Sequence, residues 1–281
     1  FLVHRLPYPP NKGDKVRSYH LLRHLQKNHR VFLGTFIDDP DDVQHLPVLQ
    51  AMCKDLHVEH IEPRSAKIKS LSGLLTGEPL TLTYYRNAGM QRWVQQTVAE
   101  HKLQACVVFS SAMAQYAQPL LPDLPMLVDF VDVDSAKWTQ YAPAHRWPLS
   151  MVYRREGRRL LAYERAVAAQ AHCSYFVTPN ETALFVSQAP EAKGRVQSMG
   201  NGVDCDFFKP DAQLANPFDQ GEQALVFTGA MDYWPNIDGV SWFVADMLPR
   251  LLASHPGLRF YIVGRSPSPQ VKALAGPNVV V

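Results

Sequence analysis

The chain has 281 residues, enough for two domains of ordinary size, and its 46% apolar content is sufficient to build hydrophobic cores. The formal net charge is +2 with both signs mixed along the chain, which excludes the strongly basic surface of a typical nucleic-acid-binding protein. The four cysteines are far apart and form no Cys-x-x-Cys pair, which argues against a zinc site and favours buried thiols in a reducing compartment. We find no signal peptide and no apolar run near the ~18 residues of a membrane-spanning helix, so we expect a cytoplasmic protein.

Both ends of the sequence read as interrupted elements. The first residue is Phe1 rather than Met, and residues 1–4 have the pattern of a strand already under way. Residues 278–281 read as a strand that lacks the loop or helix expected after it. We therefore expect the sequence to be part of a longer chain.

Short apolar runs alternate with amphipathic stretches, a pattern typical of parallel sheets with crossover helices, so the predicted fold class is α/β. In the first part of the chain, strands are predicted over residues 1–4, 31–37, 55–62, 105–109, 126–131, 172–178 and 195–199. Helices are predicted over residues 14–28, 41–54, 88–101, 150–170 and 180–188, with a further one ending near residue 120. Asp14 and Asn180 are the predicted N-caps of two of these helices.

Two stretches of this part are less regular. Residues 64–87, which contain Gly77 and Pro79, read as a short helix and an irregular connection. Residues 132–149, which contain Pro143 and Pro148, read as a long loop.

The last part of the chain repeats the alternating pattern. Strands are predicted over residues 224–227, 258–263 and 278–281, and helices over residues 235–254, with an interruption or end near Pro249, and over 269–275. This is only half of a doubly wound domain. We therefore divide the chain into an N-terminal Rossmann-like domain over residues 1–199, an interdomain hinge over 200–215, and the first part of a C-terminal domain over 216–281.

A turn-forming segment separates the two parts. Asn201-Gly202 is a strong turn signal, because Gly adopts positive φ without steric cost and Asn tolerates it better than most residues. Asp204 can bond the nearby backbone, and Pro210 prevents a helix from running through. The segment is therefore either an ordinary tight turn or a hinge between two nucleotide-binding folds.

The string Asn-Gly-Val-Asp at positions 201–204, followed by two phenylalanines and Lys209-Pro210, resembles the interdomain segment of glycosyltransferase family 4. This resemblance implies the GT-B fold, with two Rossmann-like domains of parallel sheets, of which the C-terminal one is truncated here. It assigns Asn201, Gly202 and Asp204 to the hinge and implies that ligands bind between the domains.

The first candidate site is the loop after the first strand, because ligands bind beyond the carboxyl ends of the strands in open parallel sheets. Gly13 allows the backbone to approach a ligand closely, and the helix that follows offers free N–H groups to an anion. Lys12, Lys15 and Arg17 add positive charge, although a solvated loop with surface lysines is the alternative. The loop lacks the Gly-x-Gly-x-x-Gly fingerprint of dinucleotide binding.

The string Pro-Tyr-Pro-Pro-Asn-Lys-Gly-Asp-Lys at positions 7–15 resembles the opening of bacterial family 4 sugar transferases of exopolysaccharide and PEP-CTERM systems. In that group the glycine loop approaches the diphosphate of the donor. The resemblance therefore assigns Lys12, Gly13 and Lys15 to donor binding.

Three aspartates alternate at the end of the strand predicted over residues 126–131. Asp129 falls within the apolar run, so its burial requires a partner, whereas Asp132 and Asp134 follow the strand. Close carboxylates can raise one another's pKa, which suits proton transfer. The alternatives are a capped turn, solvated side chains or a divalent metal site. Family 4 members often carry a His or Asp in the matching loop, and this resemblance assigns Asp132, with Asp134 second, as the catalytic candidate.

The long helix over residues 151–170 has a basic side formed by Arg154, Arg158 and Arg165. Such a side is either a solvated face or a surface for anionic lipid or a phosphorylated lipid carrier. We therefore include peripheral contact with the inner face of the plasma membrane among the expectations. Glu164-Arg165 resembles a pair often found at this place in the family, and an ion pair between them is the structural interpretation.

Two glycine turns in the last part of the chain are the remaining candidates. The string at positions 227–236 resembles the first donor-domain loop of the family, in its Trp-Pro-Asn variant, and assigns Gly229, Ala230 and Asn236 to donor binding. A cap for the helix that follows is the alternative role of Asn236. Gly264-Arg265 resembles the next donor loop. Each turn precedes a helix and offers backbone N–H groups to phosphate.

The sequence departs from the family pattern in two ways. No basic residue occurs between positions 229 and 249, where many members place an Arg and a Lys that clamp the diphosphate, so the charge would come from Lys12, Lys15 or Arg265. The Glu-x7-Glu segment that grips the donor sugar is also missing. We therefore expect the 281-residue chain by itself to be poorly active.

The resemblance implies a retaining glycosyltransferase that moves a sugar from a nucleotide-diphosphate donor to a polysaccharide or a lipid-linked glycan. It implies no metal and no other cofactor. Two alternatives stay open: a nucleotide-sugar epimerase of the same fold, and a nucleotide-binding protein without catalytic activity.

Overall fold

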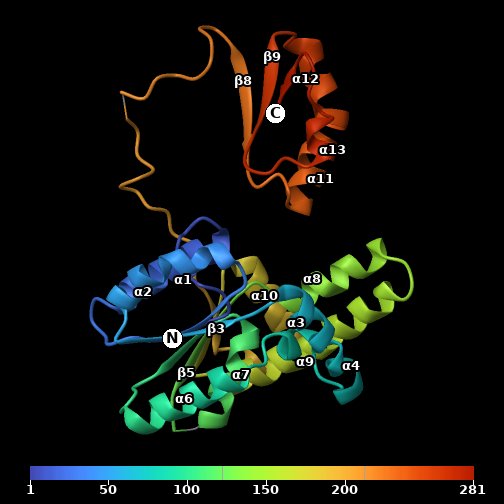
Figure 1. Ribbon diagram of the computed structural model, residues 1–281. Coiled ribbons are helices and arrows are strands. Elements are labelled where there is room, and N and C mark those ends of the chain that lie inside the picture. Colours follow the sequence, from blue (N-terminus) through green and yellow to red (C-terminus); the bar gives the residue numbers. More distant parts are fainter. Residues whose placement is uncertain (122, 212) are drawn as a thin grey trace. The chain divides into compact units, whose positions relative to one another are not determined.

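The computed structural model describes residues 1–121, 123–211 and 213–281, which divide into two compact units (Figure 1). The larger unit comprises Phe1–Val203, and the smaller unit comprises Asp204–Val281. Each unit contains its own parallel sheet and its own hydrophobic core. In the described part of the chain, no helix has both the length and the apolar composition needed to cross a bilayer.

The larger unit is built on a seven-stranded sheet in the order β3-β2-β1-β4-β5-β6-β7, in which every pair of neighbours is parallel. The strands are β1 (Leu2–Val3), β2 (Phe32–Ile37), β3 (Asp55–His60), β4 (Cys106–Phe109), β5 (Met126–Val131), β6 (Cys173–Phe176) and β7 (Val196–Ser198). The strand order reverses direction between β1 and β4. In open α/β sheets this reversal is where ligands bind.

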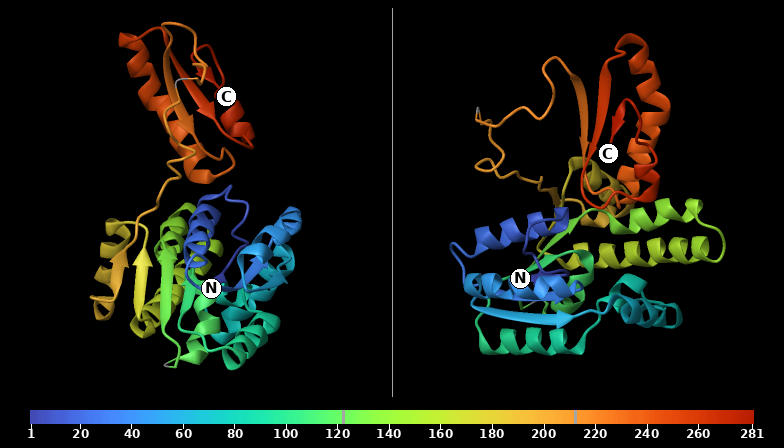
Figure 2. Two further views of the ribbon diagram at one scale, coloured as in Figure 1. Left: turned by 90° about the vertical axis from the view of Figure 1, so that its left-hand side faces the viewer. Right: turned by 45° about the horizontal axis from the view of Figure 1, so that its top comes forward.

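Helices cover both faces of this sheet (Figure 2, left). They are α1 (Gly13–Leu25), α2 (Leu46–Met52), α3 (Pro63–Ser70), α4 (Ser72–Thr76), α5 (Leu80–Tyr84), α6 (Ala88–Glu100), α7 (Ala114–Ala117), α8 (Asp134–Tyr141), α9 (Leu149–Gln170) and α10 (Pro179–Gln188). Short 3-10 turns are η1 (Pro40–His45), η2 (Ser111–Met113), η3 (Gln118–Leu120), η4 (Ala142–Ala144) and η5 (Pro190–Ala192).

Successive strand residues supply two separate cores. Leu2 and Val108 belong to the larger core, which includes residues of α6, α7, α9 and α10, whereas Val3 and Phe109 belong to a second core with residues of α1 and α2. This division follows from the alternation of side chains along a strand. It explains why the central strands read as continuous apolar runs, since both of their faces are buried.

The predicted loop over residues 132–149 is wrong, because the chain there forms α8 and η4. Trp138 of α8 packs edge-on against Tyr153 of α9, with ring centroids 5.1 Å apart. Gly157 permits this close packing, since a side chain there would collide with Thr139 and with the backbone of Ser135. The helix therefore depends on its tertiary partner more than on its own sequence.

Residues 64–87 contain three short helices instead of the single one that we predicted. Gly77, at φ 78°, ends α4 in the left-handed conformation. The start of α5 is held from a distant helix: Glu156 of α9 accepts hydrogen bonds from the backbone N–H groups of Leu80 at 2.7 Å and Thr81 at 2.9 Å. A buried carboxylate thus replaces the local cap that the sequence lacks.

Both predicted N-caps lie two residues after the observed ones. The N-cap of α1 is Lys12, and Asp14 lies in the first turn, where its carboxylate contacts Arg5. The N-cap of α10 is Thr178, whose hydroxyl accepts a hydrogen bond from the Glu181 N–H. The predicted helix over residues 41–54 is divided into η1 and α2, with Pro47 in the first turn of α2.

The smaller unit has a three-stranded parallel sheet in the order β10-β9-β8. Its strands are β8 (Gln223–Thr228), β9 (Leu258–Val263) and β10 (Val279–Val280). The helices are α11 (Trp234–Trp242), α12 (Leu248–Ser254) and α13 (Pro269–Lys272), and a π-helical turn, η6 (Phe243–Met247), joins the first two. The helix predicted over residues 235–254 is interrupted by this turn, which ends just before Pro249, close to the break that we predicted.

A buried ion pair joins α1 to β5. Arg17 donates from Nε to Asp129 Oδ2 at 2.8 Å and from a terminal nitrogen to Oδ1 at 3.1 Å. A further Arg17 nitrogen donates to Asn201 Oδ1 at 2.9 Å. Burial raises the pKa of the Asp129 carboxyl, and the pairing with Arg17 opposes that shift. The partner that burial of Asp129 requires is therefore present.

We expect Arg17→Met to destabilise the full chain by about 3–5 kcal/mol, because it leaves the Asp129 charge buried and unpaired. Adding Asp129→Asn should recover much of this loss, since the amide oxygen can still accept the Val131 N–H bond that Asp129 accepts now. Urea unfolding measures both effects. Arg30→Met, an exposed control, should change the stability by less than about 0.5 kcal/mol. An equal loss in both single variants would contradict the role of the pair.

Candidate functional site

A cavity of about 530 Å³ lies at the carboxyl ends of β1, β4 and β5, where the strand order reverses. Its apolar walls are mostly aromatic, from Tyr84, Tyr85, Phe109, Phe130, Trp138 and Tyr141. Its polar groups come from the ends of the three strands and the helices that follow them, and they include His4, Asp14, Ser111, Asp132, Asp134 and Lys137. An apolar cavity with a few convergent polar groups is the usual form of a small-molecule site.

His4 follows β1 directly and lies beside Asp14. Its Nε2 atom is 3.6 Å from Asp14 Oδ2, and its ring is stacked on Phe109 with centroids 5.9 Å apart. The Nδ1 atom of His4 is buried and has no hydrogen-bond partner in the described structure. Burial favours the neutral form of Asp14, but His4 and Arg5 outweigh it and hold the pKa of this carboxyl far below its ordinary value. Asp14 therefore stays ionised and orients the imidazole.

The backbone is strained where β4 and β5 end. Ser110 has φ 76° and Val131 has φ 70°, and both residues line the cavity. A positive φ is uncommon for any residue with a side chain and is a genuine outlier for a β-branched one. Next to Ser110, the hydroxyl of Ser111 is buried without a hydrogen-bond partner among the described residues. Strain and an unpaired buried hydroxyl at one place indicate a site that a ligand completes.

The three predicted aspartates take different positions. Asp132 and Asp134 line the cavity and share Lys137, whose Nζ lies 2.8 Å from Asp132 Oδ2 and 3.0 Å from Asp134 Oδ1. Burial lowers the pKa of Lys137, but the two carboxylates outweigh burial and raise it above its ordinary value. Asp129 is bound instead to Arg17. Among the described residues, no group of three or more His, Cys, Asp or Glu side chains is arranged to hold a metal ion.

The start of α8 is fixed by a buried glutamate. Glu164 of α9 accepts hydrogen bonds from the Ser135 hydroxyl at 2.6 Å and the Ser135 N–H at 3.3 Å. Burial raises the pKa of Glu164 to about 8, an effect that the bonds from Ser135 only partly offset. Glu164 and Arg165 bind different partners, since Arg165 pairs with Glu191 at 2.6 Å. The ion pair that we expected between Glu164 and Arg165 is therefore not formed by these two described residues.

The predicted diphosphate loop is only partly available to a ligand. Gly13 is exposed at the first position of α1, and Lys12 precedes it. Lys15 is buried, and its Nζ lies 2.6 Å from Asp42 Oδ2. Because Asp42 already neutralises this ammonium, Lys15 supports the fold. Lys12 and Gly13 stay predictions for donor binding.

The residues predicted to form the hinge do not share one turn. Asn201 is bound to Arg17, and Gly202 is exposed and has no positive φ, so the expected left-handed Asn-Gly turn is absent at these two described residues. Asp204 behaves as predicted: its Oδ1 accepts hydrogen bonds from the N–H groups of Asp206 and Phe207, each at 3.1 Å. The larger unit ends just before it, at Val203.

In the smaller unit, the two predicted donor turns lie side by side at the carboxyl ends of β8 and β9. The N–H of Gly229 donates to Val263 O at 3.0 Å, and the Met231 N–H donates to Arg265 O at 2.9 Å. Gly264 is packed directly on the carbonyl of Gly229, where no side chain fits.

Asn236 of α11 belongs to the same cluster. Its amide donates to Ala230 O at 3.0 Å, and its side chain makes no cap bond to the start of α11. The structure therefore brings Gly229, Ala230, Asn236, Gly264 and Arg265 together. Asn236 holds the shape of the first turn.

Sequence reasoning missed His4, Ser111 and Lys137. His4 lies at the carboxyl end of a predicted strand, so the rule that selected the glycine loop could also have selected it. Ser111 shows no local signal, because its significance comes from being buried without a partner. Lys137 was hidden in a stretch that we predicted to be a loop.

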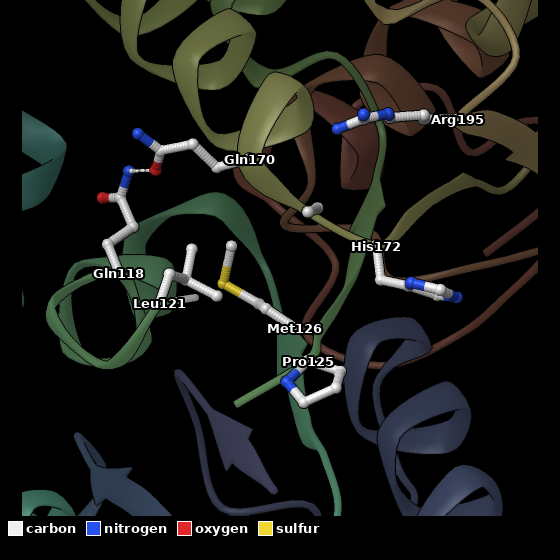
Figure 3. A pocket seen from close by; sticks show the side chains of 8 residues that line it. Gln118, Leu121, Pro125, Met126, Gln170, His172 and Arg195 are labelled. Atoms are coloured by element: carbon white, nitrogen blue, oxygen red, sulfur yellow. Dashed lines mark hydrogen bonds between the residues drawn. The ribbon is translucent and has the colours of Figure 1, made fainter. Parts of the chain in front are cut away.

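Another cavity, of about 750 Å³, lies at the opposite, amino-terminal ends of β5 and β6 (Figure 3). Gln118 and Gln170 in its wall are bonded to each other at 2.8 Å, and Arg195 donates to Ala169 O at 2.7 Å. These polar groups are already satisfied. We therefore place the candidate site in the cavity at the carboxyl ends of the strands.

No protein-family model matches the chain, and no curated protein matches it by sequence. Solved structures do match. A Listeria monocytogenes protein assigned as a UDP-N-acetylglucosamine 2-epimerase aligns with all of the chain and 68% of its own length, at 12% identity and a TM-score of 0.53. S. aureus MnaA, in a co-structure with UDP, aligns with all of the chain and 67% of its own length, at 12% identity and a TM-score of 0.49.

A UGT transferase from Siraitia grosvenorii in complex with UDP aligns with 97% of the chain and 64% of its own length, at 13% identity and a TM-score of 0.44. The chain thus spans about two thirds of the length of these proteins. The likeness to the Listeria protein confirms the predicted α/β fold class with GT-B-like, Rossmann-like sheets. Membership of family 4 stays a prediction.

We expect Gly264→Ala to destabilise the smaller unit by about 3 kcal/mol, since the added methyl group would overlap the Gly229 carbonyl. Hydrogen exchange of the β8 and β9 amides in the full chain should accelerate accordingly. Gly276→Ala is the matched control, because a methyl group at that position meets no atom within 4 Å. If the two variants exchange alike, the close packing of the turns is not important.

We expect the stability of the chain to fall as the pH rises from 4.5 towards 8, because folded Glu164 keeps a proton that the unfolded chain releases. Glu164→Gln should remove this contribution. Its melting temperature should exceed that of the wild type by a few degrees at pH 9, and the difference should vanish near pH 4.5. Glu100→Gln, at an exposed position, should leave the pH profile unchanged. A wild-type advantage at pH 9 would contradict the raised pKa.

Proposed function

We propose that the protein acts on nucleotide-diphosphate sugars, as a retaining glycosyltransferase whose acceptor is a polysaccharide or a lipid-linked glycan. The observation that carries this proposal is the cavity at the ends of β1, β4 and β5. Its volume of about 530 Å³ lies within the usual range of small-molecule sites. Sugars present apolar faces that pack on aromatic rings and hydroxyls that need hydrogen-bond partners, and the walls of this cavity supply both.

In this proposal the acceptor hydroxyl lies against His4, Ser111 and Asp132. Two of these groups, His4 Nδ1 and Ser111 Oγ, are buried without protein partners, so a ligand hydroxyl satisfies them at no cost in existing bonds. Asp14 keeps the imidazole of His4 oriented. Asp132 and Asp134, held by Lys137, supply negative charge beside the reacting sugar.

The donor is assigned to the glycine turns of the smaller unit. Gly229 and Gly264 let the two turns pack closely at the ends of their strands, and glycine turns of this kind can offer backbone N–H groups to phosphate. Arg265 supplies positive charge at these turns, whereas Lys15 of the larger unit is already paired with Asp42. Stabilisation of the leaving diphosphate by these groups is the main catalytic effect that we propose.

The structural comparison favours a second candidate. The Listeria neighbour is assigned as a UDP-N-acetylglucosamine 2-epimerase, and an epimerase would use the same fold to convert a nucleotide sugar without any acceptor. The two functions therefore differ in one observable, the requirement for an acceptor. A nucleotide-binding protein without activity is the third outcome.

A thermal-shift screen of nucleotide sugars on the full-length protein tests donor binding, and mass spectrometry of the products tests the reaction. We expect one nucleotide-diphosphate sugar to raise the melting temperature and to be consumed only when a glycan or lipid-linked acceptor is present. Conversion of the nucleotide sugar alone to an isomer would identify an epimerase. Binding without any product would identify a protein that lacks catalytic activity.

Variants of the cavity test the assigned residues. Asp132→Asn should lower the transfer rate by about 100-fold or more without unfolding the protein. Ser111→Ala should not reduce stability, because the hydroxyl has no partner to lose, but it should weaken acceptor binding about tenfold. Ser174→Ala is the matched control, since the Ser174 hydroxyl is also buried and unpartnered but does not line the cavity. Full activity of Asp132→Asn would refute the assignment.

A further inference from the structure

The larger unit exposes apolar side chains on two projections. The first comprises α3 and α4, residues 63–76, and the second comprises η4 and the start of α9, residues 142–154. Figure 1 and the right panel of Figure 2 both show α3–α4 and the α8–α9 pair extending from the same side of the sheet. We call these two segments the apolar tips.

On the first tip, the large apolar side chains face outward and the small side chains are buried. Its outward side carries Ile68, Leu71 and Leu75, spaced three and four residues apart, and their exposed fractions are 72%, 51% and 92%. The buried side carries small residues, Ala66 and Gly73 among them. A helix that packs on a protein normally buries its large apolar side chains, so this face is built to meet an apolar partner.

The second tip has the same character. Trp147 is 78% exposed at the turn before α9, and Leu149 and Met151 follow it at 50% and 59%. A tryptophan at such an exposed turn is typical of contact with the membrane interface, where its ring is apolar and its N–H stays near water.

Charge decides which partner fits. Neither tip contains Asp or Glu, and the exposed cations beside the apolar side chains are Arg64, Lys67, Lys69, Arg146 and Arg154. A surface with apolar projections among cations and no acids complements an anionic lipid bilayer. Because lipids rearrange around inserted side chains, two separate projections can both enter one bilayer surface.

We propose that the two apolar tips bind the larger unit to the surface of an anionic lipid bilayer. Leu75 and Trp147 insert at the level of the headgroups, and the surrounding Arg and Lys side chains bind lipid phosphates. Of the basic side predicted from sequence, this assignment keeps Arg154, which lies on the second tip, whereas Arg165 is paired with Glu191.

The candidate cavity lies next to the apolar tips. Lys67 and Ser70 of α3, and Trp138 and Tyr141 of α8, belong both to the cavity wall and to the helices that form or adjoin the tips. An acceptor held in the bilayer by a lipid can therefore present its polar head to the cavity. This consequence, that the acceptor is lipid-linked, rests on the proposed function, whereas binding to the bilayer does not.

Vesicle flotation of the full-length protein tests the proposal without requiring activity. We expect binding to vesicles of phosphatidylcholine mixed with phosphatidylglycerol, and weak binding to phosphatidylcholine alone. High salt should reduce the binding to anionic vesicles, since it screens exposed charges. Failure of the wild type to bind anionic vesicles would overturn the proposal, whatever the enzymatic activity proves to be.

Paired variants locate the surface. Leu75→Ser with Trp147→Ser should lower the vesicle-bound fraction about fivefold or more, because both inserted side chains are lost. Phe207→Ser with Leu214→Ser, at similarly exposed apolar positions outside the tips, is the matched control and should bind like the wild type. Equal loss in both pairs, or none in the first, would overturn the assignment.

The basic residues have their own control. Arg146→Gln with Arg154→Gln should weaken binding to anionic vesicles only. Lys27→Gln with Lys102→Gln should not weaken it, since these exposed residues follow the C-terminal ends of α1 and α6 and lie outside the tips. Sedimentation analysis identifies the competing occupant: a wild-type dimer that Leu75→Ser with Trp147→Ser dissociates would show that the tips bind a second copy, and would overturn the proposal.

Discussion

The buried ion pair between Arg17 and Asp129 connects three parts of the larger unit. It joins the N-terminal half of α1 to β5, and a third bond from Arg17 holds Asn201 near the end of the unit. The same carboxylate accepts the Val131 N–H and so supports the strained backbone at that residue. The position of Asp132 in the cavity depends on this turn. The pairing is therefore a structural requirement, because either charge without the other would be buried and unpaired.

Strained backbone and polar atoms without hydrogen-bond partners lie together at the carboxyl ends of the central strands. Ser110 and Val131 have positive φ at the ends of adjacent strands, and the unpartnered atoms of His4 and Ser111 lie beside them. Backbone strain of this kind persists only where the surrounding packing enforces it. The larger core beneath β4 and β5 provides that packing. The cavity is thus lined by strained backbone and unpartnered polar atoms above a well-packed core.

In the smaller unit, close backbone packing determines the shape of the two glycine turns. Gly229 and Gly264 are packed so closely that neither tolerates a side chain without rearrangement, and Asn236 fixes the first turn through the Ala230 carbonyl. Between Gly229 and Pro249 the sequence contains no lysine or arginine. The aromatic walls and the carboxylates of the candidate cavity belong to the larger unit. The two units therefore present different chemistry, with polar backbone in one and aromatic walls with carboxylates in the other.

The sequence by itself determined the α/β class, the parallel strands and the loops that matter, because apolar period and strand–loop position are local properties. It also placed Asp132, Asp134, Gly229 and Gly264 at strand ends, where the structure has them. Only the tertiary structure decided which charged side chains are taken up in ion pairs. Pairs such as Lys15 with Asp42, together with the helix α8 that forms against α9, join residues distant in the sequence, and local propensity carries no information about such contacts.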